Sequence, residues 1–239
     1  MRVPHNDSSY PRRGYSQTMN APLFFLHIFA LMGFICIALK IGQKALSALL
    51  ALQMVLGNLF VTKQMTLFGL DITCAEVYTI GAIFTLNLLQ TCYGKKTANR
   101  AMLISFFLLF FAIVMGELHL RYHPSSHDTM HPSFVALLKN APRIMIASIL
   151  CALASQKLDI ECFGFLRKKL PFFLSFALAS IVSQLFDTLS FSYLALYGIV
   201  HSMRDIIVMS YVVKLIVIFS MIPFTFLIKK WLPHDPVQV

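Results

Sequence analysis

Charged residues are scarce in this chain of 239 residues. They make up 13% of the sequence, hydrophobic residues make up 58%, and the mean hydropathy is +0.73. A soluble globular domain of ordinary composition carries about 25% charged residues. The deficit excludes a soluble globular protein and predicts a polytopic integral membrane protein in contact with lipid.

Cysteine motifs and phosphate-binding motifs are also missing. The five cysteines are scattered without a C-x-x-C pair, which argues against a disulfide framework or a zinc knuckle. The chain has no Walker A lysine loop, no glycine-rich phosphate cradle and no plausible Ser/His/Asp arrangement. We therefore expect no bound metal, no cofactor and no ATP-driven pump within this chain alone. Residues 1–20 lack the layout of a cleavable signal peptide and are expected to form a polar tail.

What the sequence does contain is a series of apolar runs. They cover residues 22–39, 45–62, 72–93, 101–116, 142–158, 171–198 and 202–228. Such runs suit a hydrocarbon core of about 30 Å. They predict an all-α bundle of about seven transmembrane helices, a six-helix core plus an N-terminal helix. Residues 21–230 would form a single transmembrane domain and residues 231–239 a short C-terminal tail. The purely apolar run 101–116 is expected to face lipid.

The net charge of +10 is better explained by membrane topology than by nucleic-acid binding. With seven crossings, eleven lysines and arginines fall in short loops on one side, against eight on the other. The positive-inside rule then places the first side, with the C-terminus, in the cytoplasm. The same basic loops would contact anionic lipid.

One polar motif occurs twice inside apolar runs. Ser183-Gln184-Leu185-Phe186-Asp187 repeats the letters of Ser155-Gln156-Lys157-Leu158-Asp159 at a distance of 28 residues. Gln and Asp three positions apart share one helix face, so each copy presents an amide beside a carboxylate. A mid-membrane Asp costs about 2.5–3.5 kcal/mol to insert. The motif is either an inter-helix clamp or part of a substrate or ion site, and we favour the site.

Depth along the helices groups the other polar residues. At 1.5 Å per residue, Asp187 lies about 16 Å and Lys214 about 14 Å from the outer face, so we predict that they pair. Asn58, Glu76 and Arg143 fall within about 6 Å of that face. Asn87, Gln90, Gln156 and Asp159 fall toward the cytoplasmic side. Three tiers would suit a permeation path, although hydrogen bonds between packed helices could give the same pattern.

Four histidines are spaced four apart: His119, His123, His127 and His131. On one helix they would form a metal-binding stripe. Prolines 124 and 132 interrupt any such helix, so solvated loop histidines are the favoured interpretation. A loose metal or proton-sensing site is the alternative.

The motifs together match a known family. They are Gly57-Asn58-Leu-Phe-Val61-Thr-Lys63 with Phe68-Gly69-Leu70, Tyr93-Gly94-Lys95-Lys96, Pro142-Arg143-Ile144-x-x-Ala147-Ser148, the two Ser-Gln-x-x-Asp copies, and Tyr211-x-x-Lys214 with Pro223. In order and spacing, over about residues 23–230, the chain resembles the queuosine precursor transporters, also called the vitamin uptake transporter family. The resemblance implies a multi-pass protein of the inner (cytoplasmic) membrane. It would not be an enzyme, and it would import a 7-deazaguanine base or nucleoside such as queuine, preQ0 or preQ1 for tRNA modification salvage.

The third predicted helix departs from the family. Where the family usually has Thr-Asp-x-x-x-Glu-x-Tyr-Gly, this chain has Leu86, Asn87 and Thr91. Glu76 stands eleven residues earlier, on the same helix stripe as Asn87. An acid and an amide have exchanged places, and we hypothesise that Glu76 pairs with Arg143 as an outer gate.

The polar inventory suits a deazaguanine ligand. A carboxylate can accept both adjacent N–H donors of its pyrimidine edge, and Gln or Asn amides can bind a carbonyl beside a donor. Phe186, Phe191, Tyr193 and Tyr211 are candidates for stacking on the ring. The predicted substrate-binding residues are Asn58, Glu76, Asn87, Arg143, Gln156, Asp159, Gln184, Asp187 and Lys214. A non-transporting scaffold and a membrane-embedded metal-dependent enzyme are the alternative functions. No nucleic-acid partner is expected, and homo-oligomerisation stays open.

Overall fold

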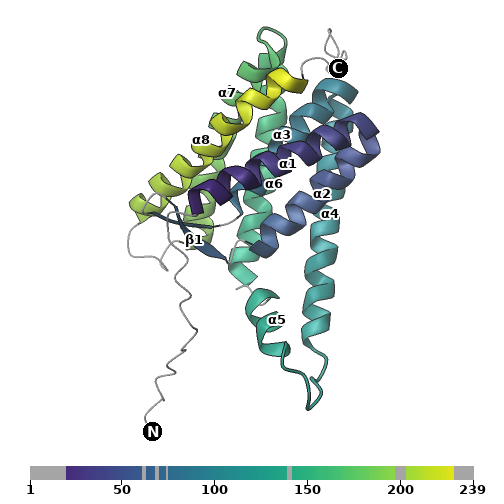
Figure 1. Cartoon of the computed structure of the whole chain (residues 1–239), viewed down its shortest axis with the longest axis vertical. Helices are drawn as coiled ribbons and strands as arrows, with labels where there is room; N and C mark the ends of the chain where they lie inside the picture. The colour runs from purple at the N-terminus through teal and green to yellow at the C-terminus, as the bar shows by residue number, and fades with distance from the viewer. Residues whose placement is uncertain are drawn as a thin grey trace.

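The computed structural model describes residues 20–60, 63–67, 70–73, 75–138, 142–196 and 203–228. Within these ranges it contains eight α-helices, a two-stranded sheet and a π-helical turn (Figure 1). In chain order they are α1 (Asn20–Ile41), α2 (Gln43–Phe60), β1 (Gln64–Leu67), β2 (Leu70–Thr73), α3 (Glu76–Tyr93), α4 (Lys95–Leu120), α5 (His131–Leu138), α6 (Pro142–Arg167), α7 (Phe172–Phe191), η2 (Ser192–Leu196) and α8 (Met203–Ile228). The predicted tails, apart from Asn20, lie outside the described residues, as does Ser202, the first residue of the predicted cap.

Seven long helices occupy the seven apolar runs. Within the described residues, four of them contain a span long and apolar enough to cross a membrane: Asn20–Ile41, Lys95–Leu120, Phe172–Leu194 and Ser210–Ile228. Polar side chains lower the hydropathy of the other three, α2, α3 and α6. These helices carry Gln53, Asn87 and Asp159, which are buried in the bundle. The protein is therefore a polytopic helical membrane protein whose less apolar helices contribute buried polar groups.

The run at 72–93 differs from its prediction because its start is a strand. β1 and β2 form an antiparallel hairpin that pairs Gln64 with Thr73 and Leu67 with Leu70. β-Branched residues at 66, 72 and 73 favour the extended backbone. The predicted turn at 68–69 lies outside the described residues. α3 consequently begins at Glu76, four residues later than expected. α6 also continues to Arg167, beyond the predicted end near 158, because no proline or glycine pair stops it.

α3 is the central helix. Its Phe84 ring packs edge-on against the rings of Phe172 and Phe176 on α7, with centroids 5.8 and 4.9 Å away. Almost one turn earlier, Gly81 lets α1 approach, since a Cβ at this position would lie 2.5 Å from Leu31. Small residues permit such close helix contacts in membranes. α3 is thereby enclosed, and its polar residues are held away from lipid.

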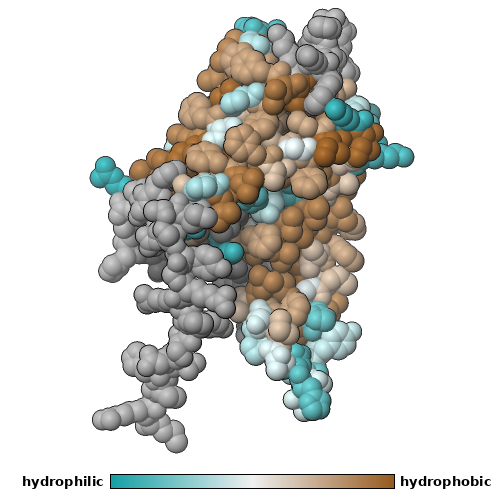
Figure 2. Space-filling model, in the orientation of Figure 1, coloured by the Kyte–Doolittle hydropathy of each residue, from teal (hydrophilic) through white to brown (hydrophobic). Residues whose placement is uncertain are grey.

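α4 supplies an outer apolar surface. Leu103, Phe107, Phe110 and Phe111 are each more than half exposed. Apolar side chains cover the middle of the face drawn in Figure 2, and hydrophilic residues gather at its lower tip, where the α4–α5 loop lies in Figure 1. One face of this segment is thus apolar and exposed while the other packs in the bundle, and contact of the exposed face with lipid stays a prediction.

Ionic contacts join α4 and α6 at one end of the bundle. Gly94, with φ of 85°, makes the one-residue turn from α3 into α4. The next residue, Lys95, forms a salt bridge with Glu161, which also pairs with Lys157 at 3.2 Å. Lys157 donates a hydrogen bond to Asn99 as well. The salt bridge of Lys95 therefore links the Tyr93-Gly94-Lys95-Lys96 motif to α6 at a charged, partly exposed surface.

Candidate functional site

The two Ser-Gln-x-x-Asp copies meet face to face on α6 and α7. Ser155 donates a hydrogen bond to Oδ1 of Asp187 at 3.1 Å, and Ser183 donates one to Oδ1 of Asp159 at 3.0 Å. The serine of each copy thus binds the aspartate of the other, as expected for antiparallel helices. Sequence reasoning missed both serines as site residues, although the repeated letters already contained them.

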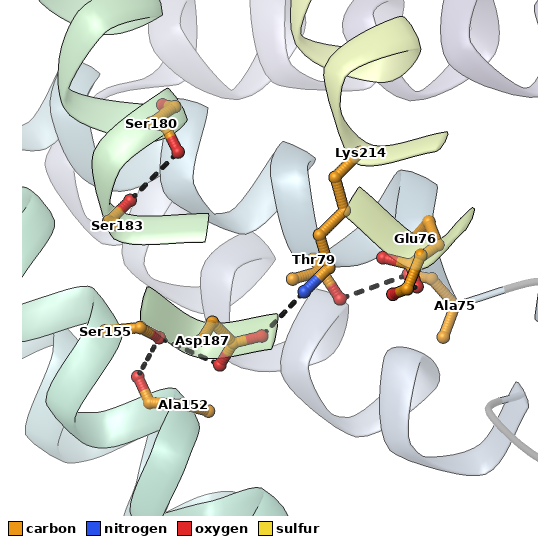
Figure 3. A network of polar contacts seen from close by, with 10 residues as sticks. Ala75, Glu76, Thr79, Ala152, Ser155, Ser180, Ser183, Asp187 and Lys214 are labelled. Carbon is orange, nitrogen blue, oxygen red and sulfur yellow. Dashed lines mark hydrogen bonds and ion pairs between the residues drawn. The ribbon is translucent and has the colours of Figure 1, made fainter. Parts of the chain in front are cut away.

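The α7 copy is neutralised by a cation. Lys214 on α8 forms an ion pair with Oδ2 of Asp187 at 2.7 Å (Figure 3). Both side chains are largely withdrawn from the surface, with exposed fractions of 6% for the lysine and 15% for the aspartate. The predicted pairing of Asp187 with Lys214 is confirmed. Since Ser155 binds the other carboxylate oxygen, Asp187 has partners on both.

Glu76 lies near this pair. Ser210, one turn before Lys214 on α8, donates to Oε1 of Glu76 at 3.5 Å. Figure 3 shows the Lys214 side chain between Asp187 and Glu76, and Lys214 and Asp187 are the charged groups that interact with Glu76. Ser210 is one turn nearer the start of α8 than Lys214, so this contact agrees with a position of Glu76 on the outer side of the Asp187–Lys214 pair, and its depth in the membrane stays a prediction. The Arg143 side chain lies outside the described residues, so the Glu76–Arg143 gate stays a prediction.

The α6 copy has different surroundings. Asp159 is fully buried, and its Oδ2 has no hydrogen-bond partner among the described residues. The Asn87 amide on α3 and the Ser180 hydroxyl on α7 lie near its carboxyl group without meeting hydrogen-bond geometry. No lysine or arginine in the described part of the chain forms an ion pair with Asp159. Asn87 itself is fully buried, and neither of its amide atoms meets a partner in hydrogen-bond geometry within those ranges.

Further buried polar atoms lie on the same helices. Gln90 donates to the Ile160 carbonyl at 3.0 Å and Gln156 donates to Met54 Sδ at 3.0 Å. Eight buried residues have a side-chain oxygen without a hydrogen-bond partner among the described residues: Asn87, Gln90, Thr91, Gln156, Asp159, Ser180, Gln184 and Thr188. Most buried polar atoms in native proteins are hydrogen-bonded, so this concentration on α3, α6 and α7 requires an explanation. These atoms are therefore the candidates for contacts with a small polar ligand.

Asn58 is separate from this centre. It lines a cavity of about 220 Å³ with Val55 on α2, Leu109 and Ile113 on α4, and Leu138 on α5. The cavity is mostly apolar and smaller than the usual range of about 300–1,000 Å³ for ligand pockets. Helical depth had grouped Asn58 with Glu76, but depth does not give the direction in which a side chain points.

Two of the aromatic candidates and His119 lie away from this centre. Phe186 and Tyr193 are 42% and 59% exposed, so they lie at the outer surface and do not flank the polar centre. The Tyr211 hydroxyl donates to the Ile181 carbonyl. His119 packs against the ring of Phe134. Among the described residues, no group of three His, Cys, Asp or Glu side chains could hold a metal ion.

A helical membrane bundle with buried ionisable and amide groups is typical of transport proteins. Residues 73–228 match the model of the family described as "Putative vitamin uptake transporter". The chain belongs to this transporter family. At the level of the family, it is a transporter and not an enzyme.

A curated relative gives a finer comparison. The "Probable queuosine precursor transporter" of Bacillus subtilis (strain 168) is 28% identical over 220 residues. The match covers 88% of this chain and 96% of the relative. No solved structure matches the chain.

Proposed function

We propose that this protein imports a 7-deazaguanine precursor of queuosine, as a base or a nucleoside, for tRNA modification salvage. The observation that carries the proposal is the group of buried amide, hydroxyl and carboxyl oxygens on α3, α6 and α7 that have no partner among the residues the structure describes. The name of the Bacillus relative supports the same substrate class. Asn87, Gln156, Asp159 and Gln184 are the proposed ligand contacts. Asp187, Lys214 and Glu76 form the adjoining charged group.

The chemistry of the ligand fits this group. The pyrimidine edge of a deazaguanine has two adjacent N–H donors next to a carbonyl acceptor. A carboxylate accepts both N–H groups, and a Gln or Asn amide can donate to the carbonyl. A site built on such hydrogen bonds rejects analogues that lack them, because its own buried groups would then stay unpaired.

The proposed topology has seven crossings in one transmembrane domain over residues 21–230 of the cytoplasmic membrane. The charged contacts of Lys95, Lys157 and Glu161 would lie at the cytoplasmic end. The number of lysines and arginines in the short loops supports this orientation. Import would then carry the base from the outer end, near Glu76, past Asp187 and Asp159.

The test is uptake of labelled 7-cyano-7-deazaguanine by cells that lack both this transporter and precursor synthesis. Expression of the protein should restore accumulation of label and queuosine in tRNA. Unlabelled base, nucleoside and other precursors added as competitors would rank the substrates. Lack of uptake of every precursor by cells with normal protein levels would contradict the proposal and favour a scaffold.

Variants connect uptake to the site. Asp159→Asn and Asp187→Asn replace an acceptor oxygen by a donor, so each should impair uptake more than a change in packing would. Glu161→Gln is the matched control, because this carboxylate lies on the same helix but about half exposed. If both Asp→Asn variants transport normally with unchanged preference, the two motifs are structural clamps.

A further inference from the structure

The two aspartates of the repeated motif differ in their electrostatic compensation. Asp187 contacts Lys214 at 2.7 Å, whereas Asp159 has no cation partner among the described residues and is fully buried. Burying an ionised carboxylate without a cation costs several kcal/mol, and the group instead takes up a proton. Burial without a described cation therefore favours the neutral form of Asp159. Its Oδ1 accepts from Ser183, which leaves Oδ2 to carry the proton.

We propose that Asp159 exchanges this proton for the substrate. A protonated carboxyl group has one donor and one acceptor, so it cannot accept from two adjacent N–H groups. The ionised form can, and the two N–H groups then take the place of a cation. The balance is simple: neutral Asp159 and a neutral base give the carboxylate–base complex and one proton, which leaves for the aqueous phase. The inference rests on the proposed function and adds that substrate binding is linked to proton release at one named side chain.

Asp187 cannot take this role in the same way. Both of its oxygens are occupied, one by Ser155 and one by Lys214. A ligand would have to break the ion pair in order to bind there. Lys214 also interacts with Glu76, so the positive charge remains near those two acids and does not compensate Asp159.

The groups that face Asp159 come from three helices. α7 contributes the Ser180 and Ser183 hydroxyls, and α3 contributes the Asn87 amide, none of which titrates near neutrality. On α6 itself, the Cys162 thiol interacts with Asp159 and with Glu161. Glu161 is paired with Lys95 and Lys157 at the exposed end of the bundle. Asp159 is the acid in this set that is both buried and without a described cation, so it is the group whose proton a ligand would displace.

The experiment is titration calorimetry of the full chain in lipid nanodiscs with 7-cyano-7-deazaguanine. Binding is measured at mildly acidic pH in two buffers that differ in ionisation enthalpy, because the difference in heat gives the number of protons released. We expect about one proton per ligand, and an affinity that rises up to about tenfold per pH unit while the free site holds its proton. The comparison ligand is 7-cyano-7-deazaadenine. Its edge has one donor and one acceptor, which matches the neutral acid, so any binding should release no proton.

Two variants localise the effect. Glu161→Gln should keep the release of one proton, while Asp159→Asn should bind more weakly without proton release or the associated pH dependence. Wild-type binding with no proton released would overturn the inference and leave the proposed function standing. Proton release that persists in Asp159→Asn would also overturn it. Absence of any binding by folded wild-type protein would overturn the proposed function and this inference together.

Discussion

The two copies of one motif have the same letters and the same secondary structure but different chemical surroundings. On α6 and α7 each serine binds the aspartate of the opposite helix, at 3.0 and 3.1 Å. The α7 copy then meets a lysine from α8, and the α6 copy meets an asparagine from α3. The motif determines the serine–aspartate hydrogen bond, and the neighbouring helix determines whether a cation balances the charge of the carboxylate.

The difference in free energy between the two arrangements is large in a membrane. Removing one partner of a buried ion pair costs about 3–5 kcal/mol, because the remaining charge is left uncompensated. A neutral acid in the same position costs only what its unmade hydrogen bonds cost, about 1–3 kcal/mol. The pair around Asp187 is therefore expected to hold the bundle together, and Asp159 is available to change partners.

The largest predicted effect is at Asp187, the aspartate that is paired with a lysine. Lys214→Met should leave Asp187 buried without its cation and destabilise the protein by about 3–5 kcal/mol. The measurement is the yield and the unfolding free energy of the purified protein in mixed micelles. Lys96→Met is the control, because Lys96 is exposed and should change little.

The double variant decides whether the pair itself is responsible. Lys214→Met combined with Asp187→Leu removes both charges, and it should recover much of the stability that the single variant loses. Recovery of transport is not expected, because the proposed function uses this charged group for uptake. If the double variant is as unstable as the sum of the two single variants, the ion pair does not explain the loss.

The second prediction concerns the surroundings of Asp159, the aspartate without a described cation partner. In Gly164→Ala the new Cβ would lie 2.6 Å from Gln90 Nε2, so the hydrogen bond from Gln90 to the Ile160 carbonyl should break. Gly33→Ala is the matched control, since nothing lies within 4 Å of its Cβ position. We expect Gly164→Ala to be less stable than Gly33→Ala by about 1–3 kcal/mol, measured by denaturation in micelles. Equal stability would show that Gln90 finds another partner at no cost.

Hydropathy and helical rise predicted a large part of this fold. The apolar runs identified seven helices, and the pairing of Asp187 with Lys214 followed from 1.5 Å of rise per residue counted from two helix ends. That calculation works because both residues lie on membrane helices joined by a short connection. It needs no knowledge of the tertiary structure beyond the direction of each helix.

The same calculation was insufficient where side-chain direction mattered. The helix expected to begin at Ile72 begins at Glu76, because residues 70–73 form a strand, and a depth count alone did not give the contact of Glu76 with Ser210. Asn58 was grouped by depth and in fact faces α4 and α5. The serine contacts depend on the register of α6 against α7, which only the packing of both helices determines.

The third prediction compares the two serines. Ser183→Ala removes the hydrogen bond on Oδ1 of Asp159, and Ser155→Ala removes one from Asp187 while Lys214 remains. A carboxylate that keeps its ion pair tolerates the loss of one hydrogen bond better. Ser183→Ala should therefore weaken precursor binding by about 1 kcal/mol more than Ser155→Ala does. Calorimetric affinities of the two variants give the answer. Equal losses would mean that the two copies contribute alike to binding.

The smallest effect is expected outside the motif, at the exposed carboxylate of α6. Glu161→Gln removes the salt bridges to Lys95 and Lys157, whose side chains are 28% and 49% exposed. Exposed ion pairs contribute about 0.2–1 kcal/mol and are screened by salt. Unfolding in micelles at low and high salt should therefore show a small loss that salt reduces further, in contrast to the loss in Lys214→Met. Lys96→Met again serves as the exposed reference. A salt-insensitive loss as large as that of Lys214→Met would show that compensation at this end of α6 is as important as within the membrane.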